Sequence, residues 1–152
     1  NLMILRGTSK FFAVPGLRLG YGLCSNSRFL EELSRIKNPW TINTLAAVSG
    51  GVMFQDESYI QRTRSLISEE RKRCLDILSQ CPQYKTYPAF ANFLLVRLMD
   101  GTTSFEMFVK CIRKNLMIRD CSSFEGLQGE YIRFCIQTKE ANDRLLKILT
   151  EQ

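Results

Sequence analysis

Histidine is absent from the 152-residue sequence. The chain therefore lacks the imidazole base that Ser-His and Cys-His mechanisms need. None of its six cysteines forms a C-x-x-C pair, so the usual zinc spacings are also missing, and we expect no metal site. Their low density favours reduced thiols in a cytoplasmic protein. The cysteines stand at positions 24, 74, 81, 111, 121 and 135.

Long apolar runs are missing too. No run approaches the ~20 residues that cross a bilayer, and the opening "NLMILRG" is typical of a buried strand rather than of a secretory signal. The net charge is +6, but the basic residues are scattered, and in the densest run, 69–74, they stand beside two acids, as on a solvated helix face. We therefore expect no membrane segment and no nucleic-acid partner, because arginines around small anionic ligands raise the charge equally well.

The hydrophobic pattern of the first half predicts two strands followed by three helices. Asn26 and Asp56 are candidate N-caps of the first and third helices, and a Gly-Gly pair at 50–51 is expected to interrupt the second. Both strands are apolar enough to be buried. The expected strands are 2–6 and 17–24, and the expected helices are 26–37, 41–54 and 56–80.

The second half has a different hydrophobic pattern, which predicts strands and helices in the order β-β-α-β-β-α. This order predicts an α+β module of roughly 70 residues on an antiparallel sheet. The two strands of the first half have no sheet to join, and a pair of strands is marginal alone. We therefore expect the chain to be the C-terminal part of a larger protein, or to pair with something else. The expected strands are 84–87, 92–98, 116–120 and 131–137, and the expected helices are 104–115 and 138–152.

The segment "RGTSKFFAVPGLRLGYG", residues 6–22, concentrates the residues with chemical potential. Lys10 follows two hydroxyls and precedes an apolar run, a setting in which desolvation lowers a lysine pKa and favours attack on carbonyls. Ser9 and Arg18 are suitable donors to a phosphate, and glycines 20 and 22 permit close approach of a ring or backbone. A reactive lysine beside a phosphate site is what pyridoxal 5'-phosphate requires. A solvent-exposed loop lysine is the alternative.

This segment resembles the cofactor-lysine motif of fold-type I pyridoxal-phosphate enzymes, the aminotransferase class I/II family. The resemblance implies an α/β transferase-like fold, with the last strands of the large domain in residues 1–40 and linking helices plus an α+β small domain in 41–152. It implies that Lys10 forms a Schiff base with the cofactor, and that Thr8, Ser9 and Arg18 hold the cofactor phosphate. Gly7 departs from the motif, since many relatives carry Ser or Thr there.

Four later segments extend the resemblance toward threonine-phosphate decarboxylases and histidinol-phosphate aminotransferases. The family implies that Arg133 binds the substrate carboxylate, that Arg119 binds its phosphate, and that Asn92 has a weaker role. A structural salt bridge is the alternative for either arginine, and for Arg119 the partner would be in the neighbourhood of Asp120 or be Glu125. Trp40 and Tyr21 are expected to pack or line the pocket. The segments are "NPWTINTLA", "PAFANFLLVRL", "LMIRDCSSFEGL" and "YIRFCIQTKEANDRLLKIL".

Three functions remain open at this point. The segment "RDCSSFEGL" favours α-decarboxylation of a phosphorylated amino acid, as in cobalamin biosynthesis. Transamination of histidinol phosphate or a related amine is the second hypothesis. A non-catalytic interaction module is the third. The resemblance implies a homodimer for the whole protein. The family places further cofactor ligands before the lysine, so we expect the 152-residue chain to be inactive by itself.

Overall fold

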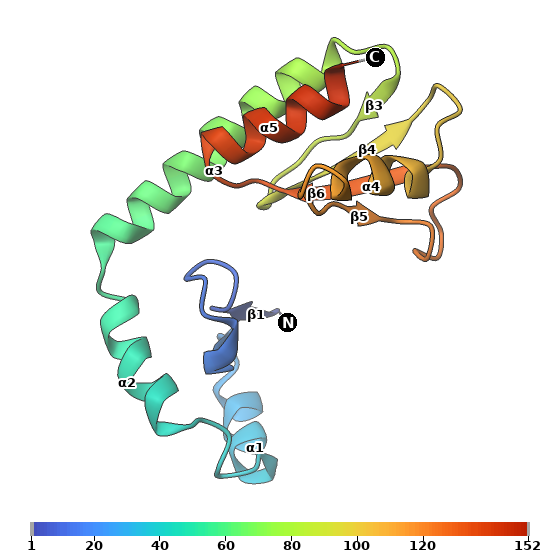
Figure 1. Cartoon of the computed structure of the whole chain (residues 1–152). Helices are drawn as coiled ribbons and strands as arrows, with labels where there is room; N and C mark the ends of the chain where they lie inside the picture. Colours follow the sequence, from blue (N-terminus) through green and yellow to red (C-terminus); the bar gives the residue numbers. More distant parts are fainter. Residues whose placement is uncertain (1, 152) are drawn as a thin grey trace. The chain divides into compact units, whose positions relative to one another are not determined.

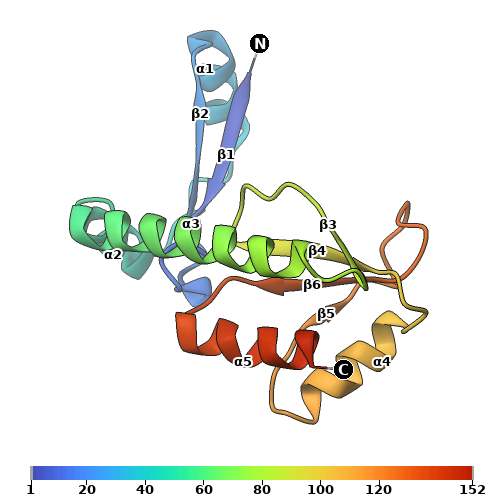
Figure 2. The same ribbon diagram turned by 90° about the horizontal axis from the view of Figure 1, so that it is seen from above.

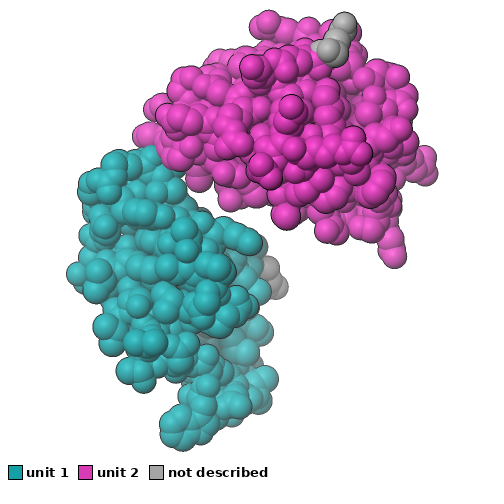
Figure 3. Space-filling view, viewed as in Figure 1, with its two compact units in different colours: residues 1–63 teal, residues 64–152 magenta. Residues whose placement is uncertain are grey.

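The computed structural model describes residues 2–151. These residues form two compact units, Asn1–Thr63 and Arg64–Gln152, which Figure 3 colours separately. The boundary between them falls inside a long helix, α3 (Glu57–Ser79). The domain boundary that the resemblance implies after residue 40 stays a prediction.

The first unit contains the elements that its hydrophobic pattern predicts (Figure 1). The predicted caps are confirmed: Asn26 accepts the N–H of Phe29 at 3.0 Å, and Asp56 accepts the N–H of Tyr59 at 2.9 Å. Such caps satisfy N–H groups that have no partner within their helix. The elements are β1 (Met3–Gly7), the 3-10 helix η1 (Pro15–Leu17), β2 (Gly20–Cys24), α1 (Ser27–Ile36), α2 (Thr44–Met53) and the start of α3.

Strands β1 and β2 form a sheet of their own. They pair antiparallel with each other, from Met3 opposite Cys24 to Gly7 opposite Gly20. Both strands are largely exposed in the described part of the chain, and their expected burial by a sheet that this part does not contain stays a prediction. The physical reason is that each strand has only the other as a neighbour, and no further layer covers either face in the described part of the chain.

Two boundaries differ from expectation. Strand β2 begins at Gly20 rather than at residue 17, because Arg18 turns the chain in the left-handed region with a φ of 54°. The glycine pair at 50–51 lies inside a continuous α2, so the predicted interruption is wrong. A Cβ on Gly50 would lie 3.0 Å from the Leu19 side chain, so this glycine allows α2 to approach the preceding loop.

The second unit is an antiparallel four-stranded sheet with helices on one face (Figure 2). The predicted β-β-α-β-β-α order is confirmed, although β5 has two residues where the sequence predicts five. The strand order is β3-β4-β6-β5. The elements are β3 (Tyr84–Thr86), β4 (Phe93–Leu98), α4 (Ser104–Ile112), β5 (Arg119–Asp120), β6 (Tyr131–Cys135) and α5 (Lys139–Thr150).

The core of this unit lies between the sheet and helices α3, α4 and α5. Alternate residues of β4 and β6 enter it, in accordance with the two-residue period of a strand. The other face of the sheet, here called the open face, carries Phe93, Leu95, Arg97, Arg119 and Arg133, which are half-buried or exposed. The largest fully buried side chains of this unit are Leu78, Leu94, Val96, Ile132 and Leu149.

A polar contact, here called the α3–α5 latch, joins two of the helices through Glu70, Arg73 and Asn142. The buried Glu70 carboxylate accepts two hydrogen bonds from Arg73, at 2.9 and 2.6 Å, and one from Asn142 at 2.8 Å. The Asn142 amide also bonds both backbone groups of Gln137 at 3.0 Å. The hydrogen bonds from Arg73 lower the pKa of Glu70 below its ordinary value despite burial of the carboxylate.

Candidate active site

The lysine loop, residues 8–19, is closed at its base by Thr8. Both the N–H and the hydroxyl of Thr8 donate to the carbonyl of Leu19, at 3.1 and 2.8 Å. Further along, the N–H of Phe12 donates to Thr8 and that of Val14 donates to Ser9, so the lysine lies in a compact turn. The backbone of the segment that carries Lys10 is therefore held by internal hydrogen bonds.

Helices α2 and α3 anchor the same loop from outside. The Tyr59 hydroxyl donates to the Phe11 carbonyl at 2.9 Å, and the Asn43 amide donates to the Leu17 carbonyl at 3.1 Å. The Tyr59 ring also stacks on Phe12, with 5.6 Å between centroids. These anchors were not predicted, because each joins residues more than 25 positions apart and no local pattern marks them.

The lysine loop and the adjoining end of β1 carry cationic side chains without acidic partners among the described residues. Residues 6–22 contain no Asp or Glu, and no described residue makes an ion pair with Arg6, Lys10 or Arg18. One N–H of Arg18 donates to the Pro15 carbonyl at 2.9 Å, which leaves its other donors for a ligand. Ser9 is half-buried. This donor set suits a phosphate, and the roles predicted for Ser9, Lys10 and Arg18 stay predictions.

Two details of the loop differ from expectation. Lys10 is exposed, so the described residues do not supply the desolvation that the sequence suggests. Thr8 is 2% exposed and its hydroxyl proton is engaged by Leu19. In this conformation Thr8 closes the loop and has no free donor for a phosphate, although its predicted cofactor role is otherwise untested.

The glycines of β2 are explained by the ribbon that β1 and β2 form. A Cβ on Gly20 would lie 2.9 Å from the carbonyl oxygen of Arg6, and one on Gly22 would lie 2.8 Å from the Met3 side chain. The strand packing therefore requires glycine at position 20, where the contact is with backbone, whereas the terminal methyl group of Met3 can move away from position 22. Tyr21, between them, is 42% exposed and meets the Phe54 ring edge-on at 5.5 Å.

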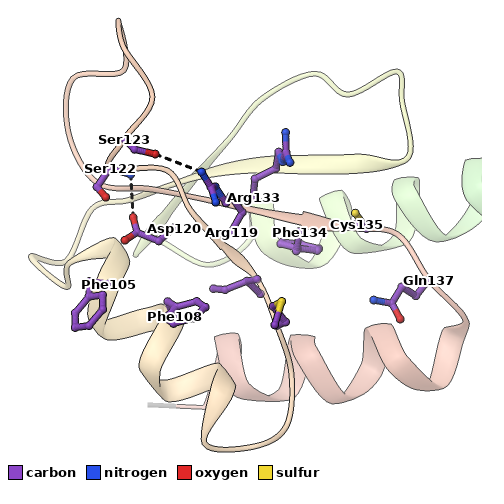
Figure 4. Close-up of a pocket in the computed structure, with 12 residues that line it drawn as sticks. Phe105, Phe108, Arg119, Asp120, Ser122, Ser123, Arg133, Phe134, Cys135 and Gln137 are labelled. Carbon is purple, nitrogen blue, oxygen red and sulfur yellow. Dashed lines mark hydrogen bonds between the residues drawn. The ribbon is translucent and has the colours of Figure 1, made fainter. Parts of the chain in front are cut away.

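The second unit contains the other predicted group, which we call the arginine pair. Arg119 on β5 lies directly opposite Arg133 on β6, so both side chains rise from the open face at neighbouring positions. The guanidinium carbons lie 5.5 and 5.7 Å from the centre of the Phe124 ring, and Arg133 also lies 5.2 Å from the Phe93 ring. Arg119 donates to the Ser123 hydroxyl at 3.3 Å (Figure 4).

Neither arginine has an acidic partner among the described residues. The alternative of a salt bridge between Arg119 and Glu125 is therefore not found. Like charges at directly opposite positions destabilise a strand pair, and an anion between them relieves that repulsion. Both side chains line a cavity of about 600 Å³, shown in Figure 4. Its other lining residues include Phe105, Phe108, Met117, Asp120, Ser122, Ser123 and Cys135.

Asn92 and Trp40 are the remaining residues that the sequence singled out. Asn92 is half-buried and its carbonyl accepts the N–H of Ile136 at 2.8 Å, which extends the pairing of β4 and β6. Its substrate role stays a prediction. Trp40 is 90% exposed, so it does not pack against the described residues as expected. Sequence reasoning missed Phe93 and Phe124, although Phe124 lies within the distinctive segment 116–127.

The described residues include no group of three or more His, Cys, Asp or Glu placed to hold a metal. All six cysteines are free thiols. None of the described helices is both long and apolar enough to cross a membrane.

Comparison with known proteins identifies the family. The family described as aminotransferase class I and II matches residues 1–149. The chain is 35% identical to threonine-phosphate decarboxylase from Salmonella typhimurium over 98% of its length, and 34% identical to histidinol-phosphate aminotransferase from Methanococcus aeolicus over 99%. It covers 40% of each of these relatives.

A solved structure shows the same fold. The histidinol-phosphate aminotransferase from Clostridium acetobutylicum matches 97% of this chain with a TM-score of 0.88 and 32% identity, and 44% of that protein is covered. The chain thus spans less than half the length of these relatives, as the unpartnered strands of the first unit suggest. The motif around Lys10, the fold of both units and these similarities agree, and the chain belongs to the aminotransferase class I and II family.

Proposed function

We propose that this chain is the C-terminal part of a pyridoxal-phosphate enzyme that acts on a phosphorylated amino acid or amine. The observation that carries the proposal is the arginine pair, two guanidinium groups at opposite strand positions with no acidic partner among the described residues. Pyridoxal phosphate, when bound, supplies an electron sink for reactions at the carbon that bears the substrate amine. The cofactor fits the lysine loop, which combines one amine with hydroxyl and guanidinium donors and contains no acid.

In this proposal the lysine loop holds the cofactor. Lys10 holds it covalently and, once released by the substrate, moves a proton at the substrate α-carbon. Ser9 and Arg18 donate hydrogen bonds to the cofactor phosphate. Thr8 stabilises the backbone of the loop, because its hydroxyl donates to the Leu19 carbonyl.

The arginine pair binds the substrate. Arg133 holds a carboxylate through two parallel N–H donors, and Arg119 holds the phosphate. The Phe124 ring contacts both guanidinium groups and limits their rotation without neutralising their charge. Asn92 is a weaker candidate for a substrate contact.

We favour decarboxylation of an O-phosphorylated amino acid such as phosphothreonine, as in cobalamin biosynthesis. A substrate with one carboxylate and one phosphate matches two arginines, and the segment "RDCSSFEGL" supports the decarboxylase branch of the family. Transamination of histidinol phosphate is the second candidate, supported by relatives of nearly equal similarity. An amino donor such as glutamate also presents a carboxylate to Arg133. By resemblance, we further propose a cytoplasmic homodimer for the whole enzyme.

The test is an absorption spectrum of the complete enzyme with pyridoxal phosphate, followed by O-phospho-L-threonine. We expect a Schiff-base band that Lys10→Ala abolishes and that Lys37→Ala, a matched change of a lysine outside the loop, preserves. Release of carbon dioxide would support the decarboxylase. Amino transfer to a keto acid without carbon dioxide would support the aminotransferase. A spectrum that does not depend on Lys10 would refute both and favour the interaction module.

A further inference from the structure

Ser104, the first residue of α4, lies between two carboxylates. Its side chain is 1% exposed, and its Oγ lies 2.8 Å from Asp120 Oδ1 and 2.8 Å from Glu130 Oε2. Its backbone N–H donates to the same Glu130 oxygen at 2.6 Å. We call Ser104, Asp120 and Glu130 the serine clasp.

The donors of the clasp can be assigned by counting protons. Ser104 has one hydroxyl proton for two carboxylates. Because Glu130 already receives the backbone N–H of Ser104, the hydroxyl is available to Asp120. Asp120 also accepts the N–H of Ser122 at 2.8 Å, and this bond is the main reason that its pKa is lowered. The N-terminus of α4 favours both negative charges through its partial positive charge.

The clasp joins the two ends of the 121–130 loop, because Asp120 immediately precedes the loop and Glu130 ends it. This loop carries Phe124, which contacts both members of the arginine pair, and Ser123, which accepts a hydrogen bond from Arg119. Thus one serine hydroxyl and its own N–H connect α4 to the segment that surrounds the proposed anion-binding groups.

Backbone hydrogen bonds also hold this segment among the described residues. Strand β5 has two residues and pairs only with β6, at Arg119–Arg133 and Asp120–Ile132. The Cys121 N–H donates to the Tyr131 carbonyl at 3.0 Å, the Phe124 N–H donates to the Cys121 carbonyl at 2.9 Å, and the Leu98 N–H on β4 donates to the Glu130 carbonyl at 2.9 Å. A two-residue edge strand offers few hydrogen bonds to resist fraying.

We propose that the serine clasp positions the 121–130 loop and thereby sets the orientation of Arg119 toward an anionic substrate group. Ser104 is a positioning residue in this view, since it contacts the loop ends and not the substrate. The part that concerns the substrate rests on the proposed function. The part that concerns the loop stands on the geometry alone.

The experiment compares Ser104→Ala with Thr103→Ala in the complete enzyme. Thr103 is the N-cap of the same helix and forms a capping box with Glu106, so its loss weakens the same helix end without touching the loop. Hydrogen exchange of peptides from residues 119–131 and the kinetics with a phosphorylated substrate are measured for both. Glu130→Gln, which keeps an acceptor for Ser104, is the milder variant if Ser104→Ala does not fold.

For Ser104→Ala we expect exchange of the 119–131 amides to be about tenfold faster, and the KM for the phosphorylated substrate to rise about tenfold with kcat within about twofold. Thr103→Ala should change neither. Glu130→Gln should stay close to wild type, whereas Glu130→Ala should resemble Ser104→Ala. If the 119–131 amides exchange hydrogen equally fast in Ser104→Ala and Thr103→Ala, the proposal that the clasp positions the loop is overturned.

Faster exchange with an unchanged KM would overturn the link between the clasp and substrate binding. If the wild-type enzyme turns over no phosphorylated amino acid or amine, the proposed function fails. The exchange measurement then still decides whether the clasp holds the loop, so the two failures are distinguishable.

Discussion

Asn142 offers the sharpest test of how the second unit is held together. Replacing it with alanine removes one hydrogen bond to the Glu70 carboxylate and two to the backbone of Gln137. A bond to a charged group contributes about 1.5–3 kcal/mol and a neutral one about 0.5–1.5 kcal/mol. The higher helix propensity of alanine offsets about 0.6 kcal/mol of the loss in the free energy of unfolding. The net loss in the free energy of unfolding is expected to be about 3 kcal/mol.

The assay is urea unfolding of the complete enzyme, followed by circular dichroism and by hydrogen exchange of α5 peptides. Gln137→Ala is the matched control, because the latch uses only the backbone of Gln137 and this exposed side chain contributes little. We expect the control to stay within about 0.5 kcal/mol of wild type. A loss below about 1 kcal/mol for Asn142→Ala would refute the reasoning that the latch stabilises the contact between α3 and α5.

Two further outcomes concern charge and burial. Hydrogen bonds from Arg73 lower the pKa of Glu70 in the folded state below its ordinary value of 4.5. The ionised carboxylate therefore stabilises the fold above pH 4.5, and this stabilisation is lost as the pH falls through the lower folded-state pKa. The stability difference between wild type and Glu70→Gln should therefore be largest near neutral pH and shrink below pH 4.5, and a constant difference in pH-dependent unfolding would contradict this. Burial raises the pKa of the Cys74 thiol to about 11, whereas Cys135 is exposed. Iodoacetamide at pH 8 should label Cys135 about a hundredfold faster than Cys74 by mass spectrometry, and comparable rates would show that Cys74 is accessible.

Local features of the chain were predictable because their causes are local. Asn26, Asp56 and Thr138 cap helices through bonds to residues three positions away. The strands of the second unit follow from runs of β-formers with a two-residue period, and the antiparallel order follows from short connections. The arginines were recognisable because a charged side chain within an apolar strand requires a partner.

Features that depend on distant residues were not predictable. The burial of β1 and β2 depends on neighbouring layers that the described residues do not contain, so their apolar composition alone does not define it. The serine clasp joins Ser104 to residues 16 and 26 positions away. The resemblance implies a phosphate contact for Thr8, which stays a prediction, whereas no local pattern marked the hydrogen bond from its hydroxyl to a carbonyl 11 positions along the chain.

The arginine pair links these features to the choice of reaction. Strand register places Arg119 opposite Arg133, so the spacing of their backbones is set by the sheet. Their guanidinium groups contact Phe124 on the 121–130 loop, which in our proposal sets the direction of Arg119. Which substrate bond is aligned for cleavage depends on ångström-scale orientation. If the proposed function holds, substitutions that loosen this loop should alter the ratio of decarboxylation to amino transfer more than substitutions in the lysine loop, because the lysine serves both reactions whereas the arginines orient the substrate.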